Sequence, residues 1–165
     1  MQTWTSFRDV ASTLLERRRA QRGFPTLGDD ADRALVAGLA SLPADAGALA
    51  RETGALLGAQ VFARRYHDDT LPRGVALLSE AMAASGLGAL DVDHAFHRAA
   101  RVRFRPSRDL DRAPEPVRAA FVEGVLLGFF SSTYNCEAHA ARVAPDLVEL
   151  TLGEGRDVNR RGQPA

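Results

Sequence analysis

Residues 90–105 read LDVDHAFHRAARVRFR, and they contain two runs in which apolar and polar side chains alternate. In the second run the order is Arg101-Val102-Arg103-Phe104-Arg105. In the first run one set of alternate positions is Leu90, Val92, His94 and Phe96, and the other is Asp91, Asp93, Ala95 and His97. A period of two indicates half-buried β-strands, because successive side chains of a strand point to opposite faces. Two such runs with a short connection predict an antiparallel hairpin.

The sequence that follows this hairpin predicts a buried helix and a second hairpin. Residues 106–116 are rich in Asp, Arg and Pro and indicate a loop. Val117 to Ser132 is apolar on most helical faces, which is typical of a helix in the middle of a fold. Asn135 to Val143 and Leu147 to Leu152 then indicate two more strands, joined by the turn Ala144-Pro145-Asp146.

The sequence before the first hairpin has the spacing of amphipathic helices, with apolar residues at i, i+3 and i+4. We expect four helices there: Thr5 to Ala20, Asp29 to Pro43, Ala46 to Tyr66, and Pro72 to Ser85. The complete order predicts an α+β fold with N-terminal helices packed on a four-stranded antiparallel sheet, and one buried glycine-containing helix between two β-hairpins. We assign residues 1–152 to a single domain and residues 153–165 to a flexible C-terminal tail.

Composition narrows the classes of function. The chain has 165 residues, and its 21 basic residues balance its 21 acidic residues. This balance argues against a nucleic-acid partner, which usually requires a basic excess. Every basic residue is Arg, which is typical of GC-rich coding and indicates a bacterial protein. The N-terminus lacks the features of a signal peptide, and the longest apolar stretch, Val125 to Phe130, is too short to span a bilayer. We therefore predict a cytoplasmic protein without a membrane span.

The groups that could carry chemistry are few. Asp91, Asp93, His94 and His97 form one compact set of possible metal ligands, but strand alternation places His94 on the face opposite the other three. Cys136, the single cysteine, and His139 also lie on opposite faces of their predicted strand, so we interpret Cys136 as a buried, inert thiol. The sequence predicts no catalytic residues, no metal site and no cofactor.

A line of small residues on the buried helix is the most informative feature for binding. Ala120, Gly124 and Gly128 recur every four residues and therefore lie on one side of the helix. One interpretation is close packing of this helix on the sheet. The other is the wall of a cavity for an apolar small molecule, and both can hold together. The ligand site predicted on this second interpretation consists of Ala120, Phe121, Gly124, Val125, Gly128 and Phe129.

Three segments carry a resemblance to known proteins: Gly86 to Val92, Val102 to Ser107, and AFVEGVLLGFF from Ala120, with the closing hairpin after them. This layout resembles the 4-vinyl reductase domain family and the Bet-type subunits of the transport protein particle, the TRAPP complex. The haem-dependent nitric oxide-binding domain is a more distant relative. The resemblance covers roughly residues 51–152. It implies a small-molecule sensor, an accessory domain or an assembly subunit, often dimeric through its helices.

The chain departs from the 4-vinyl reductase pattern at one point. Members of that family typically carry three cysteines that look like metal ligands, and a gap-free placement brings Ala119, Ala141 and Leu147 to these positions. The metal chemistry of that branch is therefore not carried over.

These observations favour a non-catalytic small-molecule-binding or regulatory domain with an apolar pocket, which we expect to form a homodimer. One alternative is a structural interaction module that dimerises through its helices, as the transport-particle subunits do. Another is an accessory protein of tetrapyrrole metabolism.

Overall fold

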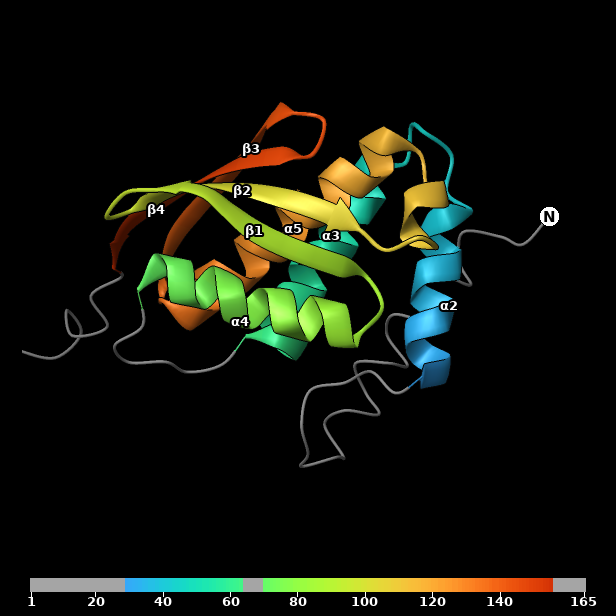
Figure 1. Cartoon of the computed structure of the whole chain (residues 1–165), viewed down its shortest axis with the longest axis horizontal. Coiled ribbons are helices and arrows are strands. Elements are labelled where there is room, and N and C mark those ends of the chain that lie inside the picture. The colour runs from blue at the N-terminus through green and yellow to red at the C-terminus, as the bar shows by residue number, and fades with distance from the viewer. Residues whose placement is uncertain (1–28, 64–69, 156–165) are drawn as a thin grey trace, which may run out of the picture.

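The structure is a computed structural model that describes residues 29–63 and 70–155 (Figure 1). The helix predicted from Thr5 to Ala20 lies outside the described residues. Within them the fold is α+β, as predicted, with a four-stranded antiparallel sheet and helices that precede and separate its two hairpins. No helix of the described residues combines the length and apolar character that crossing a bilayer would need.

The sheet consists of two hairpins side by side. Strands β1 (Gly88–Ala95) and β2 (Ala99–Pro106) form the first, and β3 (Cys136–Ala144) and β4 (Leu147–Gly155) form the second. The strand order is β1-β2-β4-β3, so β2 and β4 join the hairpins in the centre of the sheet. β2 shows the predicted alternation, because Val102 and Phe104 are buried while Arg101, Arg103 and Arg105 are exposed.

The helices form two layers on the apolar face of the sheet (Figure 1). α4 (Leu71–Ala84) packs mainly on β1, and α5 (Glu115–Thr133) packs mainly on β3. α3 (Gly47–Leu57), extended by a π-helical turn at Gly58–Phe62, packs on the other side of α5. α2 (Asp29–Ala40) lies at one end of the molecule, beside the short 3₁₀ helix Leu110–Arg112.

α5 occupies the centre because layers cover it on two sides. The sequence predicted a helix that is apolar nearly all round, and Phe121, Leu126 and Phe130 are indeed fully buried. Each buried aromatic side chain removes a large apolar area from water, so this helix contributes much of the hydrophobic stabilisation of the fold.

Two details differ from the sequence prediction. The alternation of β1 is interrupted by a register shift between Val92 and His94, so both Asp93 and His94 are exposed instead of lying on opposite faces. In addition, β4 continues to Gly155, which pairs with Cys136 of β3. Residues 153–155 thus belong to a strand and not to the tail, because their hydrogen-bonding partners on β3 extend the hairpin beyond Leu152.

Candidate functional site

The glycine line of the predicted ligand site on α5 packs against α3. A Cβ atom at Gly124 would overlap the carbonyl oxygen of Arg51, and a Cβ atom at Gly128 would overlap that of Ala55. Gly54 and Gly58 on the facing side have the same relation to the backbone of α5. Glycines on both helices therefore let the two backbones approach more closely than any side chain would permit.

This packing identifies the neighbour of the glycine line. We expected the glycine line either to pack on the sheet or to border a cavity, and instead it faces α3. Phe121, Val125 and Phe129 are each at most 1% exposed, and Ala120 lies next to Gly47 at the start of α3. Neither of the two pockets described below is lined by any of the six residues of the predicted ligand site.

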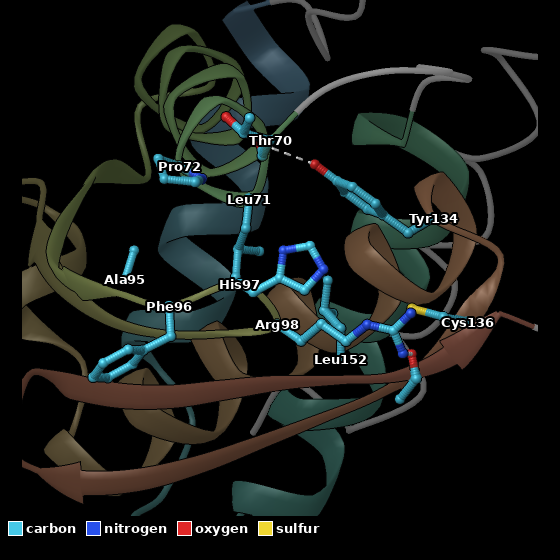
Figure 2. A pocket seen from close by; sticks show the side chains of 11 residues that line it. Thr70, Leu71, Pro72, Ala95, Phe96, His97, Arg98, Tyr134, Cys136 and Leu152 are labelled. Atoms are coloured by element: carbon cyan, nitrogen blue, oxygen red, sulfur yellow. Dashed lines mark hydrogen bonds between the residues drawn. The ribbon is translucent and has the colours of Figure 1, made fainter.

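A hollow lies at the C-terminal end of α5, beside the start of α4 (Figure 2). We call it the end pocket, and its volume is about 660 Å³. Four parts of the chain meet there: the first residues of α4, the β1–β2 turn, the α5–β3 junction and the end of β4. The residues that line it are Thr70, Leu71, Pro72, Ala95, Phe96, His97, Arg98, Tyr134, Cys136, Leu152 and Gly153.

Contacts with Phe130 and Thr70 fix Tyr134 in the wall of the end pocket. Its ring stacks on Phe130 with the centroids 5.4 Å apart, and its hydroxyl donates a hydrogen bond of 3.2 Å to the carbonyl oxygen of Thr70. Gly74 of α4 leaves room for this side chain, because a Cβ atom there would lie 3.1 Å from the ring of Phe130 and closer still to the Tyr134 hydroxyl. Tyr134 thus links the start of α4 to the end of α5 (Figure 2).

The β1–β2 turn forms the opposite wall and is held by main-chain hydrogen bonds. The N–H of Phe96 donates to the carbonyl oxygen of Ala99 at 2.7 Å, and the N–H of Leu152 donates to that of Arg98 at 2.8 Å. The guanidinium of Arg98 donates to the carbonyl oxygen of Gly153 at 3.3 Å. Figure 2 shows the side chain of Arg98 extending across the pocket toward Cys136, and the imidazole of His97 on the same side of the turn.

Cys136 and His139 do not form a pair. Cys136 is 4% exposed on the apolar face of β3, where its thiol lies 4.0 Å from the carbonyl oxygen of Phe130. His139 is exposed on the opposite face, beside Glu137. The structure therefore confirms that the two side chains point to opposite faces of β3.

Two of the four possible metal ligands in the first hairpin, Asp91 and Asp93, form ion pairs. Asp91 lies 2.7 Å from Arg105, and Asp93 lies 3.3 Å from Arg103. The ring of His94 makes an edge contact with Phe96, at a centroid distance of 4.5 Å. Within residues 29–63 and 70–155, no three His, Cys, Asp or Glu residues are grouped closely enough to hold a metal ion.

A smaller pocket of about 250 Å³ lies between α2 and the 3₁₀ helix. Its lining has both signs of charge, with Asp32 and Asp109 opposed by Arg33 and Arg112. Ser85, at the end of α4, also contributes to this lining and is fully buried. This mixture of charges contrasts with the lining of the end pocket, to which the described residues contribute Arg98 and His97 but no carboxylate.

No protein-family model matches this chain, and a comparison with curated protein sequences finds no match. The 4-vinyl reductase resemblance therefore stays a prediction, and the geometry of the site has to carry the functional argument.

Local sequence patterns do not reveal Thr70, Arg98 and Tyr134, because these residues come from three separate segments that meet only in the folded chain. One signal was present: the turn at residues 96–98 reads Phe-His-Arg, so it places an aromatic ring and two potential cations together at a hairpin end. Local patterns indicate a possible metal ligand at His97 and a core residue at Cys136, and neither pattern indicates a shared pocket.

Proposed function

We propose that this protein is a non-catalytic small-molecule-binding or regulatory domain, and that its ligand occupies the end pocket. The observation that carries this proposal is the pocket itself. A volume of about 660 Å³ lies in the range of about 300–1,000 Å³ that is typical of small-molecule sites. Such sites combine an apolar wall with a few polar groups that orient the ligand, and the end pocket has both.

The apolar part of the wall supports an apolar ligand body, as the sequence predicted. Leu71 and Leu152 are buried residues of the core whose side chains reach the pocket. Ala95 and Pro72 add small apolar surfaces on either side. A ligand that covers these groups removes apolar area from water, which is a favourable free-energy change.

The polar groups of the pocket favour binding over catalysis. The Tyr134 hydroxyl and the Arg98 guanidinium are both committed to main-chain carbonyl oxygens, so their positions are fixed before a ligand enters. The Cys136 thiol is buried, and burial among apolar groups opposes formation of the reactive thiolate. Preorganised donors beside an inert thiol suit recognition.

A fluorescence titration tests this proposal. N-phenyl-1-naphthylamine, a neutral apolar dye, should bind the wild type saturably at one site per chain. Ala95→Trp fills the pocket with an indole ring and should abolish this signal. Ala141→Trp is the matched control, because it makes the same change on the exposed face of β3 and should bind the dye like the wild type. Absence of saturable binding, or equal binding by Ala95→Trp, would contradict the proposal.

The second candidate is an interaction module that forms a homodimer through its helices. Among the described residues, Leu56 on α3 is one of three large exposed apolar side chains, at 37% exposure, and it lies on the side of α3 away from α5. Leu57, Val61 and Phe62 of the same helical segment are buried within the chain and offer no surface to a partner. Light scattering should give a dimer mass for the wild type and a monomer mass for Leu56→Glu. A monomeric wild type at micromolar concentration would exclude this candidate.

A further inference from the structure

The end pocket has an unbalanced charge. Arg98 and His97 line it, and no Asp or Glu contributes to its lining in the described part of the chain. In a concave site with low-dielectric walls, one sign of charge raises the local concentration of ligands of the opposite sign. The lining therefore discriminates between anionic and neutral ligands of the same size.

Arg98 differs from the other arginines of its hairpin. Three arginines on the outer face of β2 each pair with a carboxylate on a neighbouring strand: Arg101 with Glu149 at 3.3 Å, Arg103 with Asp93 at 3.3 Å, and Arg105 with Asp91 at 2.7 Å. Arg98 has no such carboxylate partner among the described residues, and its guanidinium donates one hydrogen bond, to the carbonyl oxygen of Gly153. A guanidinium has five N–H donors in a planar fork, so most of its donor capacity remains for a ligand.

The start of α4 adds a second positive contribution on the facing wall. Thr70 is the N-cap residue and its side chain makes no capping hydrogen bond with the helix. The first turn of a helix carries a partial positive charge, and the residues that begin α4, Leu71 and Pro72, line the pocket. Pro72 has no N–H, so the charge on this wall comes from the helix dipole and not from a row of donors. Arg98 and the helix terminus thus favour an anion from two sides.

We infer that the ligand of the end pocket is a small amphiphilic carboxylate, such as a fatty or aromatic acid. Its carboxylate forms a charge-assisted hydrogen bond with Arg98, and its apolar body covers Leu71 and Leu152. A carboxylate can accept two parallel hydrogen bonds from the planar fork of Arg, whereas a compact anion such as chloride cannot. The apolar wall favours a ligand that also has an apolar body. This inference rests on the proposed function, because it specifies the ligand of the same pocket.

Displacement of the dye by two matched competitors tests the inference. Octanoate and 1-octanol share the same chain length and differ in the head group. With the wild type, octanoate should displace N-phenyl-1-naphthylamine at roughly tenfold lower concentration than 1-octanol, which is the size expected of one charge-assisted hydrogen bond. In Arg98→Gln this advantage should disappear while displacement by 1-octanol stays unchanged, and Arg98→Lys should retain part of it.

Arg101→Gln is the matched control, since it removes a guanidinium from the same hairpin outside the pocket, and it should keep the octanoate advantage. Equal displacement by both competitors in the wild type would overturn the carboxylate inference and leave the proposed function intact. Persistence of the advantage in Arg98→Gln would assign the carboxylate to another group and overturn the inference as well. If the dye does not bind the wild type at all, both the inference and the proposed function fail.

Discussion

The middle of α5 is closely packed against its neighbour, whereas its C-terminal end borders a pocket. In the middle, Gly124 and Gly128 interlock with the backbone of α3 and leave no space between the helices. At the end, Tyr134 stands beside a pocket of about 660 Å³ that the sheet, α4 and α5 leave open. The segment with the smallest side chains is thus the most tightly filled, and the segment that ends in a tyrosine borders the largest hollow described.

The contrast shows that small residues on a helix do not by themselves indicate a cavity. The absence of side chains at Gly124 and Gly128 leaves space beside α5, and the backbone of α3, which has its own glycines there, fills that space. The end pocket forms instead where several helices and strands end close together. There the chain turns away from the core, so no further element covers the apolar surface between these ends. A ligand site in this fold is therefore expected at the ends of elements and not along the central helix.

The largest effect should come from adding a single carbon atom in the packed region. Alanine usually stabilises a helix relative to glycine by about 1 kcal/mol, but at Gly124 or Gly128 the new methyl group would overlap a backbone carbonyl of α3. We expect each Gly→Ala variant to lower the free energy of unfolding by about 1–3 kcal/mol or more, measured by urea denaturation.

Gly47→Ala provides the control for these variants. The added Cβ atom would lie 3.6 Å from the Cβ atom of Ala120, which is an ordinary contact, so stability should change little. If Gly124→Ala and Gly128→Ala are as stable as Gly47→Ala, the backbones of α3 and α5 do not approach each other as closely as described.

An intermediate effect is expected at Glu123, which ties α5 to both of its neighbours. Its carboxylate lies 3.0 Å from the guanidinium of Arg51 on α3 and accepts a hydrogen bond of 3.2 Å from the main-chain N–H of Arg142 on β3. Glu123→Ala should cost about 1–2 kcal/mol in thermal or chemical unfolding. Glu149→Ala, which breaks the more exposed pair with Arg101, should cost about 0–0.5 kcal/mol. Equal losses would show that Glu123 does not connect the layers.

The smallest effect on stability should be found in the end pocket. Arg98 gives up one exposed hydrogen bond when it is replaced by Gln, so the free energy of unfolding should change by no more than about 0.5 kcal/mol. A loss of several kcal/mol would instead assign Arg98 a structural role. The end pocket would then contribute to stability as the packed middle of α5 does, and the contrast between the two regions would not hold.

Local periodicity predicted the elements well, because it depends on neighbours within one segment. Arg101-Val102-Arg103-Phe104-Arg105 alternates in burial as expected, and α5 is buried as its composition indicated. The register shift in β1 was not predictable in this way. It separates Val92 from His94 through pairing with β2, and the pattern of β1 alone does not record that pairing.

The candidate site depends on contacts between segments that are distant in sequence. Local sequence patterns do not reveal such contacts. The glycine line on α5 correctly indicated a close neighbour, but it could not distinguish a sheet, a ligand or the glycines of α3. Thr70, Arg98 and Tyr134 lie far apart in sequence and meet only because α4 and β1–β2 pack at the end of α5. Their roles follow from geometry that no single segment encodes.

The most direct test of this account is an NMR titration of the ¹⁵N-labelled protein with octanoate, followed through its amide chemical shifts. We predict saturable shifts that cluster at Thr70, in the turn at 95–98, at Cys136 and at residues 152–153. The amides of Gly124 and Gly128 should remain unchanged. Shifts concentrated along the α3–α5 interface would return the ligand site to the glycine line, and the absence of any saturable shift would contradict the end pocket as a binding site.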